Sequence, residues 1–215
     1  MMDYIEITPQ KELSSFIKCF WEYKSKGKDI HHTIFPNGCF ELIMVFEKWE
    51  LASEYIFNRE ISSILDSILL LNPNFWGLKE LDSLPFSDRT IEIGKKLSRI
   101  IREKEIDQEK QLLLTTVYTP DLNVEEVANI THWDRRRINR YFNKQFGLSS
   151  KTFLNIIRLR SSFESIKEST LYPDLNYYDQ SHYIKETKKY TGESPKKLLK
   201  NEDDRFLQFS VNRKP

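Results

Sequence analysis

Residues 123–148 read NVEEVANITHWDRRRINRYFNKQFGL, and this stretch decides the fold of the C-terminal half of the chain. It predicts a short helix, a tight turn and a longer basic helix, which is the arrangement of a helix-turn-helix. Asn123 and Glu126, three residues apart, predict a capping box at the first helix, and Asp134 caps the second. Gly147 ends the second helix, because glycine readily adopts the left-handed backbone found there.

Both predicted helices are amphipathic. The first has an apolar stripe that includes a small residue, so that a second helix can cross close by; the stripe is Val124, Val127, Ala128 and Ile130. The apolar positions of the second recur at three- and four-residue spacings and are Ile138, Tyr141, Phe142 and Phe146. Its other face carries donor-rich side chains of the kind that contact bases and phosphates, namely Arg135, Arg136, Asn139, Arg140, Asn143 and Lys144.

The net charge of +1 hides a division along the chain. Residues 121–215 hold 18 Lys and Arg against 13 Asp and Glu, whereas residues 1–120 hold 15 against 19. Within residues 131–200 the imbalance is 15 against 7. A run such as Arg135 to Arg137 is usually only a solvated helix face, but with the capped helix and the regional charge it indicates a polyanion partner. Trp133 either stacks on a sugar-phosphate or packs on Ile138 as a hydrophobic staple, and we favour the staple.

Several other classes of protein are disfavoured. Two cysteines, Cys19 and Cys39, are too few for a disulfide framework or a cysteine-rich zinc site. His31 and His32 lack further ligands at suitable spacing, so we expect no metal and no cofactor. Cys39 is either a reactive thiol or a buried strand residue; we favour the latter and expect no enzyme activity. The N-terminus does not resemble a signal peptide and the apolar runs are too short for a bilayer, so we expect a cytoplasmic protein.

The chain before residue 120 has a different organisation. Residues 40–46, FELIMVF, predict a strand covered on both faces, entered through a Pro36-Asn37-Gly38 turn. A helix is expected over 87–106 with Ser87 as its cap, and a second over 108–119. Together these features divide the chain into an N-terminal part, a helical link, a basic C-terminal part and a tail, at 1–86, 87–119, 120–200 and 201–215.

A weak internal repeat occurs in the C-terminal half. Shifting the chain by 45 residues superposes Asp134 on Asp179 and Gly147 on Gly192, which implies a second capped basic helix with a glycine stop. A long helix over 149–169 is expected between the two copies. The repeat fails at Pro173, which falls on the position of Ala128 and shortens the first helix of the second copy, because an interior proline costs about 3 kcal/mol.

The residues over 123–160, NVEEVANITHWDRRRINRYFNKQFGLSSKTFLNIIRLR, and over 177–199, YYDQSHYIKETKKYTGESPKKLL, closely resemble the DNA-binding domain of AraC/XylS-type transcriptional regulators. FIKCFWEY at 16–23 and IFPNGCFELIMVF at 34–46 resemble, more weakly, the start of the small β-rich sensor domain that precedes this module in some members. The resemblance implies an α+β protein: a small β-containing N-terminal domain followed by an all-α domain in which a long helix joins two helix-turn-helix units, the second with a shortened scaffold helix. Residues 1–86 would then be a sensor or dimerisation-like domain, 87–119 a helical linker, 120–200 the DNA-binding domain and 201–215 a C-terminal tail.

The resemblance also implies site residues and partners. Base-edge contacts would come from Arg136, Asn139, Arg140, Gln180, Ser181 and Lys185. Phosphate contacts would come from Arg135, Arg137, Lys144, Lys188 and Lys189. His182 either contacts DNA or has a core or solvent role. The implied partners are double-stranded DNA, RNA polymerase, a small-molecule effector of unknown identity and a second copy of the chain; the aromatic side chains near the N-terminus either line an effector pocket or form core.

The sequence departs from the family at several positions. Asn176 stands where glycine is usual, Thr187 replaces an apolar aromatic residue in the second basic helix, and Ser150 replaces a proline. The N-terminal half also looks short for a complete sensor barrel. An alternative function follows from Pro173 and Thr187: a degenerate relative that binds a partner protein through its helices and does not read DNA.

Overall fold

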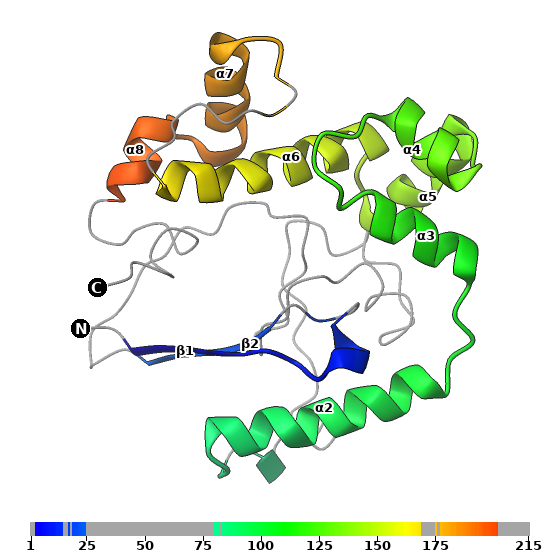
Figure 1. Ribbon diagram of the computed structural model, residues 1–215, viewed down its shortest axis with the longest axis vertical. Coiled ribbons are helices and arrows are strands. Elements are labelled where there is room, and N and C mark those ends of the chain that lie inside the picture. Colours follow the sequence, from blue (N-terminus) through cyan, green and yellow to red (C-terminus); the bar gives the residue numbers. More distant parts are fainter. Residues whose placement is uncertain are drawn as a thin grey trace.

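The computed structural model describes residues 3–14, 17, 19–24, 80–81, 83–168, 175 and 177–201. Within these residues a short two-stranded sheet lies near the N-terminus, and the remaining regular structure is helical (Figure 1). The α+β class therefore holds in this coarse form. The strand expected over 40–46 and the tail after 201 lie outside the described residues, as does Pro173 in the expected scaffold helix of the second copy.

The N-terminal sheet pairs two strands that are adjacent in the described sequence. Strand β1 (Asp3–Ile7) runs antiparallel to β2 (Phe20–Lys24), with Ile7 opposite Phe20, and the 3₁₀ helix η1 (Lys11–Leu13) lies between them. Leu13 of η1 is fully buried and packs in the same cluster as the apolar face of helix α2 (Phe86–Arg102). This packing attaches α2 to the N-terminal sheet region.

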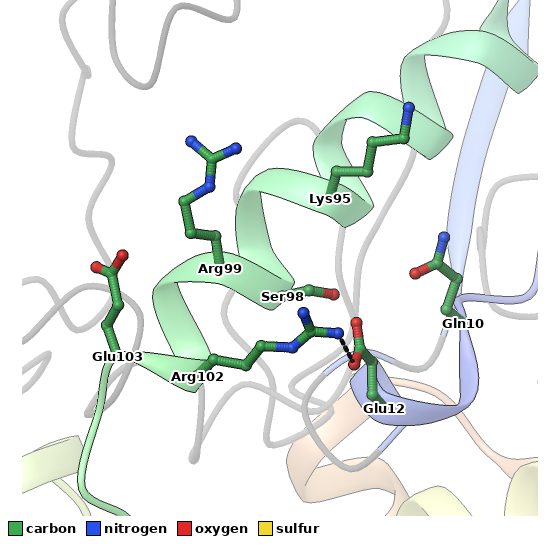
Figure 2. Close-up of a pocket in the computed structure, with 7 residues that line it drawn as sticks. All are labelled: Gln10, Glu12, Lys95, Ser98, Arg99, Arg102 and Glu103. Atoms are coloured by element: carbon green, nitrogen blue, oxygen red, sulfur yellow. Dashed lines mark hydrogen bonds and ion pairs between the residues drawn. The ribbon is translucent and has the colours of Figure 1, made fainter.

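Polar contacts flank the junction between η1 and α2. The Arg102 guanidinium donates to the Glu12 carboxylate at 2.7 Å (Figure 2). Beside this pair is a hollow of about 460 Å³, lined by Gln10, Glu12, Lys95, Ser98, Arg99, Arg102 and Glu103. Its charges are mixed, and both partners of the ion pair are substantially exposed, so we expect the pair to add little stability.

Helix α2 begins and ends earlier than the sequence predicted. Pro85 occupies the N-cap position, and its carbonyl accepts the N–H groups of Asp88 and Arg89, both at 3.0 Å. Ser87 was wrongly expected to be the cap: it lies inside the first turn, where its hydroxyl contacts Asp88. Ile106, the predicted end, lies beyond the helix and is only partly buried.

The next three helices pack together. Helix α3 (Gln108–Thr116), α4 (Val124–Thr131) and α5 (Arg135–Phe146) follow in order, and α3 contacts α4, which contacts α5. Leu113, Val127 and Phe142, one from each helix, are essentially inaccessible to solvent and belong to one core cluster. The helix predicted as part of a link therefore shares a core with α4 and α5.

Helix α6 (Ser150–Lys167) joins two groups of helices. α4 and α5 lie at its N-terminal end, whereas α7 (Gln180–Thr191) and α8 (Pro195–Lys200) pack near its C-terminal end (Figure 1). The buried side expected for α6 is confirmed at Phe153, Ile156, Ile157, Phe163 and Ile166. The second group has its own core, in which Phe163 and Ile166 meet Tyr183 and Leu198.

The 45-residue repeat is visible in the backbone. Asp134 and Asp179 cap α5 and α7 through their side chains, and each helix ends at a glycine in the left-handed conformation, with φ of 71° at Gly147 and 75° at Gly192. One expectation for the apolar stripe of α4 was wrong: Ile130 is 46% exposed. Because α4 buries Val127 and Thr131, residues four apart, its apolar stripe is too narrow to include Ile130.

Candidate nucleic-acid interface

The turn between α4 and α5 is short and closed by side-chain hydrogen bonds. His132 ends α4 with a left-handed backbone at φ 56°, which is unusual for a residue other than glycine. The Thr131 hydroxyl donates to the Val127 carbonyl at 2.8 Å and accepts the Trp133 N–H at 3.4 Å. These bonds and the buried Trp133 fix the direction in which α5 leaves α4.

The N-terminus of α5 is held by Asp134. Its Oδ1 accepts the backbone N–H groups of Arg136 and Arg137, both at 2.9 Å. The hydrogen bond from Arg137 holds the pKa of the Asp134 carboxyl below its ordinary value, with help from the Arg136 N–H and the charges of Arg140 and Arg136. The predicted cap is therefore confirmed. So is the capping box of α4, in which the Glu126 carboxylate accepts the Asn123 N–H at 2.7 Å.

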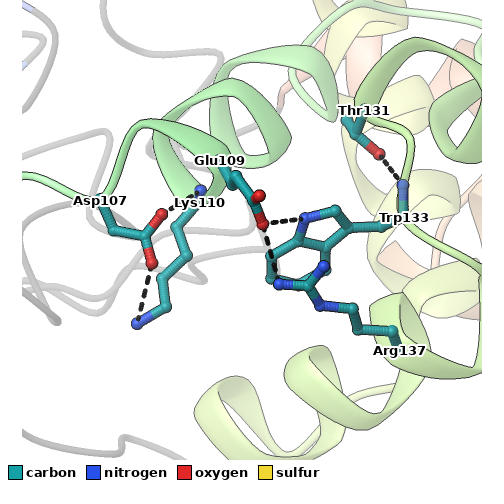
Figure 3. Close-up of polar contacts among 6 residues, drawn as sticks. All are labelled: Asp107, Glu109, Lys110, Thr131, Trp133 and Arg137. Carbon is teal, nitrogen blue, oxygen red and sulfur yellow. Dashed lines mark hydrogen bonds and ion pairs between the residues drawn. The ribbon is translucent and has the colours of Figure 1, made fainter.

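A three-residue cluster joins α3 to the start of α5. Glu109 on α3 accepts a hydrogen bond from Trp133 Nε1 at 3.1 Å and another from Arg137 at 2.9 Å (Figure 3). The Arg137 guanidinium also lies over the Trp133 ring, with Cζ 3.6 Å from the ring centroid. We call Glu109, Trp133 and Arg137 the α3–α5 clasp. Arg137, predicted to contact phosphate, thus has partners within the protein.

Two other predicted contact residues of the first group also have partners within the chain. Arg135 forms an ion pair with Glu125 of α4 at 3.0 Å, between two exposed side chains. Asn139, predicted to contact a base, accepts the backbone N–H of Ser150 at 3.1 Å and lies 3.3 Å from the Ser150 hydroxyl. Bidentate recognition of adenine uses both the oxygen and the nitrogen of an Asn side chain, and here the oxygen is engaged.

Arg136 and Arg140 differ from these residues. Both are exposed on α5, and within the described part of the chain neither side chain forms a hydrogen bond or an ion pair. Lys144 is exposed in the last turn of the same helix. Arg136, Arg140 and Lys144 thus contribute to the exposed cationic surface of α5 together with Arg135 and Arg137, which also pair with carboxylates of the protein.

The second predicted basic helix has a similar surface. Gln180, Ser181, Lys185 and Lys188 are exposed on α7. The remaining predicted phosphate contact, Lys189, pairs with Glu186 at 3.4 Å. His182 lies at the start of the helix: its N–H donates to the Asp179 cap at 2.7 Å, and its ring Nδ1 accepts the Tyr178 N–H at 3.3 Å.

Sequence reasoning missed Glu109 and Ser150 as partners of the predicted site. Glu109 is in the first turn of α3, where an acidic residue is expected to complement the helix dipole, so nothing in the pattern marked it as a partner of α5. Ser150 was noted only for the proline it replaces. A proline at position 150 would have no N–H to donate to Asn139. The hydrogen bond to Asn139 therefore requires a residue other than proline there, as Ser150 provides.

The described residues hold no group of three or more His, Cys, Asp or Glu side chains placed to bind a metal ion; His31, His32 and Cys39 lie outside them. Within the same residues, none of the helices combines the length and apolar character that crossing a bilayer requires.

Comparison with known proteins gives one match. Residues 5–63 match the family described as Domain of unknown function (DUF6597). No curated protein and no solved structure matches the chain. The matched residues precede α2 in the sequence, so the match concerns only the N-terminal part of the chain.

Proposed function

We propose that the protein is a sequence-specific DNA-binding transcription regulator of the AraC/XylS type, with α5 and α7 as its two reading helices. The single observation that supports this most is a repeated geometry: two capped, glycine-terminated helices, each with exposed polar and cationic side chains, held at different places along α6. In the first copy the short turn from α4 to α5 supports the interpretation of these two helices as a helix-turn-helix.

The length of α6 suits this proposal. Its 18 residues give a helix about 27 Å long. Successive major grooves on one face of B-DNA lie about 34 Å apart, so helices attached near the two ends of such a rod can reach adjacent grooves. The buried clusters at each end of α6 keep both helices attached to it, which would fix their spacing before DNA is met.

Within this proposal the contact residues of the two reading helices differ in whether they already have partners within the protein. On α5 the base-reading role falls mainly on Arg136 and Arg140, whose side chains form no hydrogen bond or ion pair with the residues that the structure describes. Asn139, Arg135 and Arg137 would each have to exchange a partner within the protein for DNA. On α7, Gln180, Ser181 and Lys185 are exposed and take the reading role, while Lys144 and Lys188 take phosphate contacts.

The test is selection of duplexes from random DNA with the purified full chain, followed by titration of the enriched sequence at several salt concentrations. We expect a motif spanning two major grooves, and a strong fall in affinity with salt because counterions are released when cations meet phosphates. Arg136→Ala should relax base preference at one position, whereas Lys144→Ala should weaken all sequences alike. Lys95→Ala on α2, an exposed residue of the N-terminal region, is the matched control.

The result also distinguishes the proposed function from the alternative, a protein-interaction module that does not read DNA. Equal affinity for enriched and random duplexes would contradict sequence-specific reading and favour a protein-interaction module. A motif of half the expected length would mean that α5 reads DNA and α7 does not. Effector binding by the N-terminal region, pairing with a second copy and contact with RNA polymerase belong to the same proposal, and are tested once the DNA site is known.

A further inference from the structure

Helices α6 and α7 meet at a cleft of about 300 Å³, and of its lining residues the sequence predicted a phosphate contact for Lys189 alone. It is lined by Lys151, Asn155 and Arg158 of α6, by His182, Glu186 and Lys189 of α7, and by Tyr177. On each helix the lining residues are four and three positions apart, so each helix contributes one continuous stripe. We call this hollow the α6–α7 cleft.

The cleft lies between α7, the second proposed reading helix, and the N-terminal half of α6, the half that follows α5. Its first residue, Lys151, follows Ser150, which is bonded to Asn139 on α5. Its far wall is the side of α7 that carries His182, Glu186 and Lys189, adjacent to the exposed Lys185 and Lys188. A duplex read by both helices in successive major grooves must turn the intervening minor groove toward this part of α6.

The cleft has an excess of positive charge. Lys151 is exposed and forms no hydrogen bond or ion pair within the described part of the chain. Lys189 lines the cleft from α7 with a side chain that is 59% exposed. Among the described lining residues Glu186 is the single carboxylate, and it lies 3.4 Å from Lys189. Arg158, deeper in, is 13% exposed and lies 3.5 Å from Asp121, which offsets its charge.

The floor of the cleft is also polar. The ring of Tyr177 lies beneath the Arg158 guanidinium, with Cζ 5.9 Å from its centroid. The buried Tyr177 hydroxyl forms no hydrogen bond with any residue that the structure describes. Burial raises the pKa of this hydroxyl above its ordinary value, so the group stays neutral and adds no negative charge beside the lysines. A polar, cationic hollow of this kind suits an anion rather than an apolar ligand.

We infer that the α6–α7 cleft seats a phosphate of the DNA strand that crosses between the two major grooves, with Lys151 and Lys189 as its cationic contacts. This inference rests on the proposed function and adds Lys151, on the linking helix, to the binding surface. The Glu186 carboxylate would repel the phosphate, because it lines the same cleft, and would compete with it for Lys189. The two lysines and the carboxylate therefore have opposite predicted effects on affinity.

The experiment uses the full chain and a fluorescent duplex carrying the sequence that the wild-type protein enriches from random DNA. Lys151→Gln should weaken binding three- to tenfold and lower the slope of log affinity against log salt by about one, with the enriched sequence unchanged. Glu186→Gln should strengthen binding about threefold at low salt. Lys95→Gln, outside the cleft, should change neither quantity, and thermal denaturation monitored by circular dichroism verifies that each variant is folded.

A second measurement locates the phosphate. Neutral methylphosphonate linkages are placed one at a time across the minor groove between the two half-sites. One position should weaken wild-type binding several-fold and weaken Lys151→Gln much less, because the variant has already lost the contact. If Lys151→Gln and Glu186→Gln bind the enriched duplex with wild-type affinity and salt slope, the inference is wrong while the proposed function stands. If the wild-type protein enriches no sequence, the proposed function is wrong, and the inference that rests on it is wrong with it.

Discussion

The backbone N–H of Ser150, the first residue of α6, donates a hydrogen bond to Oδ1 of Asn139 on α5 at 3.1 Å. Ser150 is buried, so this N–H has little access to water. The bond ties the proposed reading helix to the helix that sets its position, and it uses the side-chain atom that adenine recognition would need. Asn139 is therefore better explained as a residue that positions α5 on α6.

Replacing Asn139 by Ala should destabilise the protein by about 1 kcal/mol, because a buried N–H loses its acceptor. The base preference of the enriched DNA sequence should stay the same, although affinity falls as α5 loosens. Asn139→Asp keeps an acceptor oxygen and should recover most of the stability. Urea denaturation measures the first effect and selection from random DNA the second. A changed base at one position with unaltered stability would contradict the positioning role.

Local patterns in the sequence were enough to place the ends of the C-terminal helices. Asp134 with Gly147 and Asp179 with Gly192 act through the first and last turns of their own helices, so their roles do not depend on distant parts of the chain. The Asn123–Glu126 capping box is local in the same sense. Side-chain spacing likewise predicted the buried side of α6.

The partners of the surface side chains could not be predicted in this way. Arg137 meets Glu109 across 28 residues of sequence, and Asn139 meets Ser150 only because of the angle at which α6 leaves α5. A charged face on an isolated helix looks uniform, and tertiary packing decides which of its members already have partners. For this reason the sequence indicated a basic surface on α5 but could not show that Arg135 and Arg137 already have partners within the protein.

The α3–α5 clasp predicts that Glu109 and a DNA phosphate compete for Arg137. Glu109→Gln keeps an acceptor oxygen for Trp133 Nε1 but removes the negative charge that faces Arg137. Arg137 should then be freer to contact a phosphate, and affinity for the enriched duplex should rise about two- to threefold at low salt. The gain should disappear at high salt, where such interactions are screened. DNA titration at two salt concentrations makes the comparison.

Glu109→Ala is the matched variant, because it removes both interactions. The Trp133 N–H then loses its acceptor while the indole stays largely buried, and we expect the free energy of unfolding to fall by about 1 kcal/mol. Glu109→Gln should lose clearly less. Equal losses of stability in the two variants would show that the ion pair with Arg137, and not the bond to Trp133, is the main structural role of Glu109.

The Asp134 cap predicts a loss of stability in acid. The pKa of its carboxyl is lowered in the folded protein, chiefly by the hydrogen bond from the Arg137 N–H, so the ionised form is favoured by folding. Its contribution is complete above the unfolded pKa of about 3.9 and is lost as pH falls through the lower folded value. Asp134→Asn keeps a capping oxygen but does not titrate. The stability difference between wild type and this variant should be constant from pH 5 to 7 and change below about pH 4, as measured by urea denaturation. A difference that stayed constant down to pH 2 would contradict the shift.

Two buried threonines on α7 are expected to respond in opposite ways when each is replaced by valine. Thr187 on α7 is fully buried, and its hydroxyl forms no hydrogen bond with any residue that the structure describes. Thr191, one turn later, is also buried, but its hydroxyl donates to the Thr187 carbonyl at 2.8 Å and accepts the Glu193 N–H at 3.1 Å. The two side chains are chemically identical and both are buried, so their main difference is in hydrogen bonding.

Valine replaces the hydroxyl of threonine with a methyl group of similar size. Thr187→Val should raise the free energy of unfolding by about 1 kcal/mol, because a buried hydroxyl without a partner is removed. Thr191→Val should lower it by about the same amount, since the Glu193 N–H loses its acceptor. Urea denaturation of the two variants side by side measures both effects. If both substitutions destabilise the protein, the Thr187 hydroxyl has a partner in the folded chain.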